Sequence, residues 1–477
     1  MNIIQEPLYK LIPVYQPIIF VVEDDTITAT KFNVKFIAKV RVAKINTATT
    51  TQVVTLKVSP NGQGKGIFDF SKVLQSYVTS DNLGGKVSDQ VPNNFSTFKT
   101  QNFNDKRHSI HNIDKFATNK NSVRLLQIEF GIQYSETQTG SPAVDDSIVK
   151  QTEEFVIYNG TLQEDDTLQE VNDNFGYNLD VFNYIANDSD AKFLTDCPTT
   201  LEIGTNDYHT VAFFNNYEAD FVVGSVNATS PKVNAVIVKF YPEVNAQGTQ
   251  ILSTLTYNNT PTNGGSGTSY NNSNSKMIFF GCGMANFRNQ GLASGYLNAK
   301  SYKIVLRDDN GDTIGQSYIF NVLENDCKGF EKIRLTWLNR HGAWDYFNFT
   351  KKNVRTVNTT RKSFQQLKGT WNEDRFRLYG YKGGTKTFRT NSKEIISLNT
   401  DFVTEETAIW LEQLFTSPEV YILSEFSADT EAGIRRKYVK PVVITSQTYT
   451  RQTKANDKLI QYSLEIEMSK DKVIQHA

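Results

Sequence analysis

Residues 334–349 read RLTWLNRHGAWDYFNF, in which two aromatic segments flank a short polar turn centred on Gly342. The sequence changes character at this point. Before it, apolar segments alternate with long connections rich in Asn, Thr, Ser and Gly, and after it comes the strongest helix pattern in the chain. We therefore expect residues 330–350 to be a hinge between different domains. Gly342 would allow the turn, and Trp337 and Trp344 would pack the joint.

Toward the N-terminus, residues 31–42 alternate apolar and polar side chains almost without error, a period of two that is typical of a half-buried strand. Further strands are expected at residues 54–58, 126–134 and 155–158. They do not alternate with helices, which favours an antiparallel sandwich. The expected first domain covers residues 1–165. Its long polar loop, residues 80–121, is expected to be either disordered alone or ordered by a neighbouring subunit.

A second sandwich is expected at residues 179–327, with a low-complexity loop at residues 256–275 that is too polar to fold by itself. Its last two strands form a predicted hairpin, because Asn310-Gly311 favours a tight turn. The neighbouring Asp308 and Asp312 superficially suggest a calcium loop. However, Gly311 lies between the would-be ligands instead of after them, so a plain turn is the better interpretation.

The third expected domain, residues 330–477, is a β-rich assembly domain with its main helix at about residues 404–416. Thr404 is a candidate N-cap, Glu405 and Glu406 suit the first turn, and Pro418 prevents continuation. The predicted fold class is therefore mainly β: two antiparallel Ig-like β-sandwich domains, followed by a β-rich domain carrying one principal α-helix.

Composition excludes several broad classes of function. Lys and Arg number 50 against 51 Asp and Glu, so the net charge of -1 creates no global field that favours nucleic acid or anionic membrane. Three widely spaced cysteines, Cys197, Cys282 and Cys327, argue against a disulfide framework. No leader peptide and no membrane span are expected, because no apolar stretch has the required length.

No catalytic, cofactor or metal site is predicted from the sequence. His108 and His111 lie in the polar loop without a nearby Cys or further His, so a solvated or interface position is favoured over metal binding. Residues 84–86 and 383–386 contain Gly-Gly pairs but lack the spacing of a phosphate loop. Carboxylates far apart in sequence can converge in space, which one sequence cannot show. We expect the protein not to be an enzyme.

Two basic clusters allow two interpretations. In the first interpretation they are solvated loop faces or intersubunit ion pairs, and in the second they line a channel that carries nucleic acid. An aromatic cluster also allows two interpretations, a packed core or a sugar-stacking platform, the core being the commoner case. Its members are Trp337, Trp344, Tyr346, Phe347 and Phe349. The basic residues are Lys351, Lys352, Arg355, Arg361, Arg435, Arg436 and Lys437.

Four stretches, together with the cysteine-poor β domains and polar loops, carry a family resemblance. They are FVIYNG (155–160), KFLTDCP (192–198), LTWLNRHGAWDY (335–346) and WLEQLFTSPEVY (410–421). The arrangement resembles virion structural proteins of tailed bacteriophages that infect Bacteroidetes, including crAss-like phages. The resemblance covers most of the chain as an arrangement, but none of these motifs is a catalytic or ligand signature.

The resemblance implies a tail or tail-hub/baseplate ring protein located in the virion, which is assembled in the bacterial host cytoplasm. Its partners would be copies of itself in a ring of sixfold or related symmetry and other tail or neck proteins, with DNA contact left open. The expected interface or joint residues are Trp337, Arg340, Gly342, Trp344, Tyr346 and Trp410. The alternatives are a peripheral receptor- or glycan-binding tail protein and a glycan-degrading tail enzyme.

Overall fold

A computed structural model shows a mainly β protein: strands account for 52% of it and helices for 11%, which confirms the mainly β part of the expected class. The Ig-like character of the two expected sandwiches stays a prediction. The structure describes the chain except residues 8, 45–50, 81–115, 119–120, 164–169, 172–173, 176–191, 216–232, 260–276, 290–293, 309, 324–329, 372, 424–438, 451–459 and 473–477. The predicted residues His108, His111, Cys327, Arg435, Arg436 and Lys437 lie outside the described residues, as do most of the loops at 80–121 and 256–275.

The chain forms two compact units. Unit 1 comprises Met1–Asn325, Leu338–Asp345 and Glu425–Tyr438, and unit 2 comprises Asp326–Trp337, Tyr346–Ser424 and Val439–Ala477. Both predicted sandwiches fall within unit 1, and the predicted third domain supplies unit 2. The finer boundaries at 165, 179, 327 and 330 stay predictions. Each unit is described by itself below.

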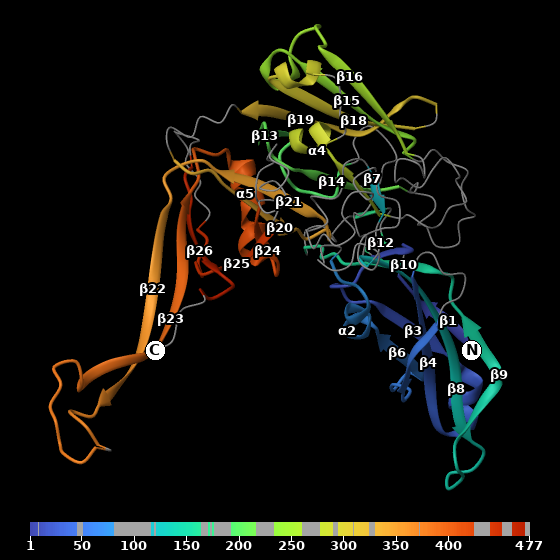
Figure 1. Cartoon of the computed structure of the whole chain (residues 1–477). Helices are drawn as coiled ribbons and strands as arrows, with labels where there is room; N and C mark the ends of the chain where they lie inside the picture. The colour runs from blue at the N-terminus through green and yellow to red at the C-terminus, as the bar shows by residue number, and fades with distance from the viewer. Residues whose placement is uncertain are drawn as a thin grey trace. The chain divides into compact units, whose positions relative to one another are not determined.

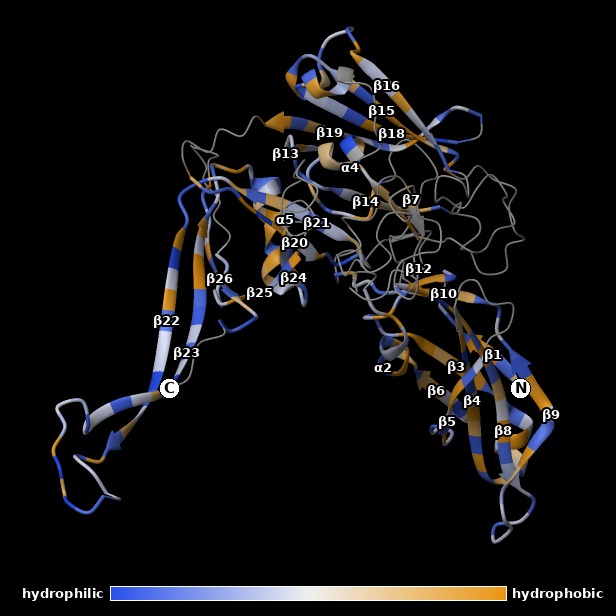
Figure 2. Ribbon diagram, viewed as in Figure 1, coloured by the Kyte–Doolittle hydropathy of each residue, from blue (hydrophilic) through white to orange (hydrophobic). Residues whose placement is uncertain are grey.

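The first part of unit 1 has two sheets around one core. One sheet has the order β2-β10-β8-β4-β5 with β9 on β8, and the other has the order β1-β3-β6. Phe20 and Phe68 of the three-stranded sheet pack against Phe130 of the larger sheet in this core. Figure 2 shows the alternation of apolar and polar residues along β4 that predicted this strand. The elements are β1 (Asn2–Gln5), β2 (Leu11–Pro13), β3 (Ile19–Glu23), α1 (Asp25–Thr30), β4 (Phe32–Lys44), β5 (Thr51–Val58), β6 (Lys65–Asp69), α2 (Ser71–Leu74), β8 (Val123–Ser135), β9 (Ala143–Gln151) and β10 (Phe155–Tyr158).

The second part of unit 1 repeats this plan. The five-stranded sheet β13-β19-β18-β15-β16 and the three-stranded sheet β14-β17-β7 enclose one aromatic core (Figure 1). The elements are β7 (Phe116–Thr118), β13 (Thr200–Gly204), β14 (Thr210–Phe214), β15 (Ala235–Tyr241), β16 (Ser253–Asn258), β17 (Met277–Gly281), α4 (Met284–Asn289), β18 (Ser301–Arg307) and β19 (Thr313–Leu323), with the short pair β11 (Glu170–Val171) and β12 (Asn174–Phe175) before them.

Three features of unit 1 correct the sequence-based expectations. First, the sheets are mixed, because β2 runs parallel to β10 and β13 parallel to β19. Parallel neighbours need a long connection between them, and most of each half supplies it. Second, residues 256–258 belong to β16, paired along β15, and not to the loop predicted at 256–275.

Third, the loop predicted at 80–121 contains β7, whose Phe116 is fully buried in the second core and contacts Phe280. Part of that loop is therefore ordered by the same chain and not by a neighbouring subunit. The reason is the apolar side chain of Phe116, which finds a buried site about 160 residues further along the chain.

The predicted hairpin turn between β18 and β19 is confirmed. Gly311 adopts φ +87°, and the Asp308 carboxylate accepts a hydrogen bond from Asp312 N at 2.8 Å. The side chain of Asp308 thus serves the turn itself, as aspartate commonly does.

Unit 2 is built on one sheet with the order β21-β20-β24-β25-β26-β23-β22. The chain passes between the units inside β20 and β21. The predicted helix is confirmed as α5 (Glu405–Thr416), with Thr404 accepting a hydrogen bond from Thr407 N and with Ala408, Leu411 and Leu414 buried. The strands are β20 (Ile333–Leu338), β21 (Trp344–Phe349), β22 (Val354–Gln366), β23 (Gly384–Asn399), β24 (Val420–Leu423), β25 (Val439–Ile444) and β26 (Ser463–Met468). Within the described part of the chain, no helix has the length and apolar character needed to cross a membrane.

Candidate interaction surface

The turn between β20 and β21, where the sequence predicted a hinge, is tightly packed inside unit 1. Gly342 has φ +76°, and a Cβ added there would lie 2.2 Å from the backbone oxygen of Asn159. The side-chain oxygen of Asn339 accepts hydrogen bonds from His341 N and Ala343 N, each at 3.0 Å. Only glycine fits both the backbone conformation and the space. The predicted turn is present, whereas a hinge motion stays a prediction.

Arg340 and His341 of this turn converge on one carboxylate, Asp196. Arg340 Nη2 donates to Asp196 Oδ1 at 3.0 Å, and His341 Nε2 lies 3.2 Å from the same oxygen. Burial opposes ionisation of Asp196, but attraction by His341 and the hydrogen bonds from His341 and Arg340 outweigh it and hold its pKa well below the usual range. Arg340, proposed as an interface residue, is therefore engaged within its own unit.

The segment that contains Asp196, residues 194–197 before β13, makes further buried contacts with the turn between β20 and β21. Thr195 Oγ1 donates to the Asp345 carboxylate at 2.7 Å, and Asn339 Nδ2 donates to Asp345 Oδ1 and to Leu194 O. Cys197 lies nearby, but burial raises the pKa of its thiol, the opposite of what an activated nucleophile needs. Two of the stretches that carry the family resemblance, residues 192–198 and 335–346, thus bond to each other and stabilise the turn within unit 1.

The aromatic residues predicted at interfaces are buried. Trp337 and Trp410 are both fully buried in unit 2, with ring centroids 5.1 Å apart. Trp344 in unit 1 and Tyr346 in unit 2 are also buried, and the Arg334 guanidinium lies over the Tyr346 ring. Trp337, Trp344 and Tyr346 thus fit the core interpretation considered for them, and a sugar could not reach them in the folded chain.

The predicted basic residues of unit 2 differ among themselves. Lys351 pairs with Asp401 at 2.6 Å, and Arg355 pairs with Glu331 and Glu394. Lys352 lines a shallow cavity of about 480 Å³ together with Lys351, Phe330 and Tyr462. Arg361 differs from these three residues because it lies on the exposed part of β22, which belongs to a larger structural feature. Among the described residues, no group of three His, Cys, Asp or Glu side chains could hold a metal ion.

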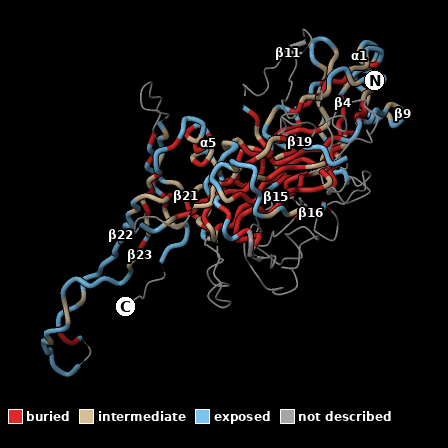
Figure 3. The backbone as a smooth tube through the Cα atoms, turned by 90° about the horizontal axis from the view of Figure 1, so that it is seen from above, coloured by how far each residue is buried: buried red, intermediate tan, exposed pale blue. Residues whose placement is uncertain are grey.

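That feature is a long β-hairpin, which the sequence reading missed. At the base of the hairpin Val354 of β22 pairs with Ser397 of β23, and at the far end Gln366 pairs with Gly384. The neighbouring strand β26 pairs only with the basal residues 395–399 of β23. We call residues 359–391, beyond this support, the distal arm. Figure 1 shows β22 and β23 continuing past β26, and Figure 3 shows them exposed along most of their length.

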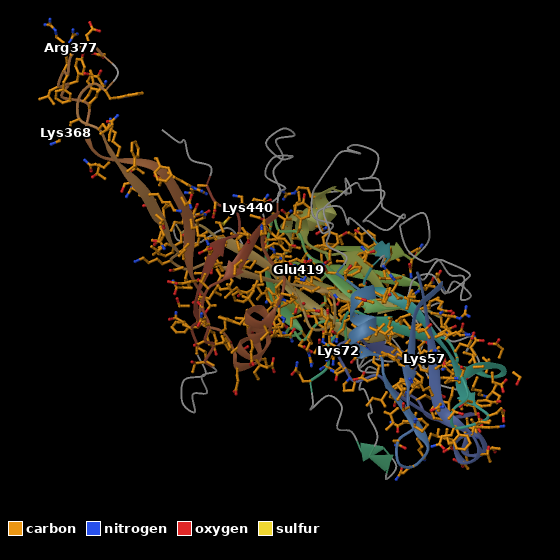
Figure 4. The ribbon with its side chains drawn as sticks, turned by 90° about the horizontal axis from the view of Figure 1, so that it is seen from below. Lys57, Lys72, Lys368, Arg377, Glu419 and Lys440 are labelled. Carbon is orange, nitrogen blue, oxygen red and sulfur yellow. The ribbon has the colours of Figure 1, made fainter. Side chains whose placement is uncertain are left out.

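The end of the distal arm, residues 367–383, has a defined shape of its own. Thr370 N donates to Arg377 O at 3.1 Å, and the Thr370 hydroxyl bonds to Arg375 O and Arg377 N. Gly383 N donates to the Gln366 side chain, and the rings of Tyr379 and Tyr381 stack. These local bonds fix the turn, with which no third strand of the described residues pairs. Figure 4 marks its position by the labels Lys368 and Arg377.

Large apolar side chains project from this end into solvent. Five of them are about 70–80% exposed, far more than the other apolar residues of the described chain, of which the most exposed reaches 56%. We call these five the tip cluster: Leu367 (69%), Trp371 (81%), Phe376 (68%), Leu378 (73%) and Tyr381 (71%). Contiguous exposed apolar surface on a soluble protein marks an interaction site.

The distal arm is also strongly basic. It has eight Lys and Arg residues and two acidic residues, a net charge of +6 in a chain whose total is -1. Lys362 and Arg389 lie directly opposite each other across the strands, where like charges repel. None of the eight has an ion pair with another described residue. They are Arg361, Lys362, Lys368, Arg375, Arg377, Lys382, Lys386 and Arg389.

The signal that would have identified the arm is weak but present. Residues 354–366 and 384–393 are rich in Thr, Asn, Ser and Lys, with no apolar face, so they do not produce the alternation that identifies a half-buried strand. The Gly383-Gly384 pair lies where the chain enters β23, and both residues have positive φ. A turn between two segments rich in β-branched threonine indicates a hairpin.

No protein-family model matches the chain, and no curated protein matches its sequence.

Proposed function

We propose that this chain is a structural component of a phage virion, a tail or tail-hub/baseplate ring protein that acts through subunit interfaces. The observation that carries the proposal is the tip cluster: five large apolar side chains held in solvent at the end of an ordered arm. The sequence resemblance to tail proteins of Bacteroidetes phages supports the same function. On this view the chain binds protein partners and has no catalytic activity.

The energetics favour a partner for the arm. Apolar surface costs roughly 25 cal/mol for each Å² left in water, and a fully buried aromatic side chain covers about 150–250 Å². Trp371 and Phe376, at 81% and 68% exposure, leave most of that area unburied. The hydrogen bonds of Thr370 hold the end of the arm in one shape, so a partner would not have to order it on binding.

The rest of the architecture is assigned as follows. Unit 2, which carries the arm, forms or docks onto the ring. The two cores of unit 1 are Ig-like sandwiches that decorate or brace the ring, and their polar loops order on contact with neighbours. The hinge predicted at residues 330–350 connects these parts along the chain. Because Trp344 is buried, Trp344→Ala alters the fold of unit 1 as well as any joint, and tip variants test assembly more cleanly.

A second candidate function rests on the same exposed rings. Trp371 and the stacked pair Tyr379 and Tyr381 have the flat faces that stack on sugars, which favours a peripheral receptor- or glycan-binding tail protein. Leu367 and Leu378, however, are equally exposed and cannot stack in this way. The mixture of aliphatic and aromatic side chains therefore favours a protein interface over a glycan site.

The test uses phage particles made with the triple variant Trp371→Ser/Phe376→Ser/Leu378→Ser. All three side chains are exposed, so the variant chain should fold normally while its incorporation into particles falls at least tenfold, measured by quantitative immunoblotting of purified particles. Tyr15→Ser is the matched control, because Tyr15 is a 48% exposed aromatic residue on unit 1. Normal incorporation of the triple variant contradicts the proposal. Normal particles that no longer adsorb to cells would indicate the glycan- or receptor-binding function instead.

A further inference from the structure

We infer that the partner of the distal arm is a second copy of this chain, and that the arm of one copy binds the outer face of α5 on the next. This inference rests on the proposed function and names the partner of its interface. Arm and receiving face are different surfaces, so the contact is head-to-tail. Such contacts close into a ring when the rotation between neighbours permits it.

The end of the arm favours a protein partner over phosphates. Glu373 and Asp374 lie in this end, residues 367–383, beside four Lys and Arg residues, so the end presents both signs of charge. Two carboxylates there would be repelled by the phosphates of nucleic acid or of an anionic membrane. A protein surface can supply both signs of charge. Leu367 and Leu378 add apolar surface that suits a protein groove and not a stack of bases.

Charge complementarity points to a copy of the same chain. The distal arm has a net charge of +6 and the whole chain -1, so the remainder of each copy carries -7. Around the proposed receiving helix the charge is acidic as well: residues 401–419, which contain α5, hold five acidic residues and no Lys or Arg, so an arm laid there meets opposite charge. It would also relieve the repulsion between the facing side chains of Lys362 and Arg389. In a closed ring every arm would be neutralised in this way.

The outer face of α5 has the matching chemistry. Phe402, just before the helix, is 56% exposed, and Ile409, one turn into it, is 45% exposed. Between them Glu405 and Glu406 are exposed and form no ion pair with described residues. We call these four residues the α5 face. It combines apolar and acidic side chains, as the distal arm combines apolar and basic ones.

The available area is sufficient. The three aromatic and two leucine side chains of the tip cluster, at 68–81% exposure, offer several hundred Å² of apolar surface. A stable interface buries about 800 Å² on each partner. The paired strands of the distal arm, residues 359–366 and 384–391, carry further basic residues and can supply the remaining area.

A charge swap on the full-length chain tests the inference. The first variant reverses the arm (Lys362→Glu/Arg389→Glu), and the second reverses the α5 face (Glu405→Lys/Glu406→Lys). Sedimentation velocity over a concentration series measures self-association of each variant alone and of their equimolar mixture. Each variant alone should associate at least about fourfold more weakly than wild type, because each variant removes two exposed pairs and each pair contributes a roughly two- to fivefold effect. The mixture should recover association, since each reversed surface then finds its complement.

Several controls keep the result interpretable. Thermal melts check that reversal at the first turn of α5 has not unfolded unit 2, and Glu405→Gln/Glu406→Gln gives a milder version that should weaken association in the same direction. Raising the salt concentration from about 0.1 M to about 1 M shortens the screening length from about 10 Å to 3 Å and should weaken wild-type association. Tyr15→Ser should associate like wild type.

Some outcomes overturn the inference while leaving the proposed function intact. One is a wild-type chain that stays monomeric at the highest attainable concentration while the tip variant still fails to enter particles, which would assign the arm to another virion protein. Failure of the mixture to recover association rejects the α5 face. Tip-dependent binding to single-stranded DNA or to vesicles of anionic phospholipid, without self-association, rejects a second copy as the partner.

Discussion

The turn at Gly342 and the end of the distal arm are both hairpin ends built on glycines with positive φ, yet their surroundings are opposite. Around Gly342 the neighbouring backbone approaches closely, and Asn339, Arg340 and His341 all bond within unit 1. At the end of the arm Trp371 is 81% exposed and a Cβ on Gly384 would touch nothing. The polar and aromatic side chains of the first turn bond and pack within its own unit. The second turn leaves its large apolar side chains exposed to a partner.

Substituting the glycines compares the two turns directly. Gly342→Ala should lower the free energy of unfolding of unit 1 by about 4 kcal/mol, combining backbone strain with overpacking against Asn159. Gly384→Ala has a nearly identical φ of +77° but open space, so it should cost unit 2 only about 1–2 kcal/mol. Chemical denaturation measures both. Equal losses would show that the close approach at Gly342 is unimportant.

Removing the charge of Asp196 tests the polar side of the comparison. Asp196→Asn leaves Arg340 and His341 without the carboxylate that both contact and should destabilise unit 1 by about 2–3 kcal/mol. The side chains of Asp196 and Arg340 are 20% and 17% exposed, which places the loss at the lower end for a broken buried pair. The arm should be unaffected, so self-association at equal folded concentration serves as the control. Unchanged stability would mean that the cluster is dispensable.

The same carboxylate predicts a pH dependence. The folded pKa of Asp196 is depressed, so its contribution is present above the unfolded pKa of about 3.9 and is lost as pH falls toward the folded value. The unfolding free energy of wild-type unit 1 should therefore fall more steeply than that of Asp196→Asn below about pH 4, and the gap between them should narrow. Parallel curves from pH 7 to pH 2 would contradict the assigned cause.

The smallest effect on stability is expected at the arm. Trp371→Ala removes a large side chain that is 81% exposed, so the unfolding free energy of unit 2 should change by less than about 0.5 kcal/mol. Trp337→Ala, in the buried pair with Trp410, is the contrasting variant and should cost about 3–5 kcal/mol. A large loss from Trp371→Ala would place that ring in the fold and remove the basis for a free surface.

The comparison also explains what the sequence could predict. The strands with one buried face and α5 with its Thr404 cap follow local rules, so the predicted ends of β4, β5, β8 and α5 lie within three residues of the observed ones. The arm was missed because neither face of β22 is buried, and no apolar alternation marks it. Asp196 was missed as the partner of Arg340 because 144 residues separate them. Parallel pairing of β13 with β19 was likewise invisible, since it depends on the path of the whole chain.

The three residues of β7 make the two halves of unit 1 depend on each other during synthesis as well as in the folded protein. Phe116 leaves the ribosome about 160 residues before its neighbours on β17, an interval of roughly 8–32 s at bacterial or slower elongation rates. During that interval its ring has no buried site, although the strands of the first half, which end with β10 at Tyr158, are already synthesised early in it. A fragment that ends near residue 165 would keep that exposed phenylalanine permanently. The two halves should therefore be expressed, purified and exchanged between proteins as one piece.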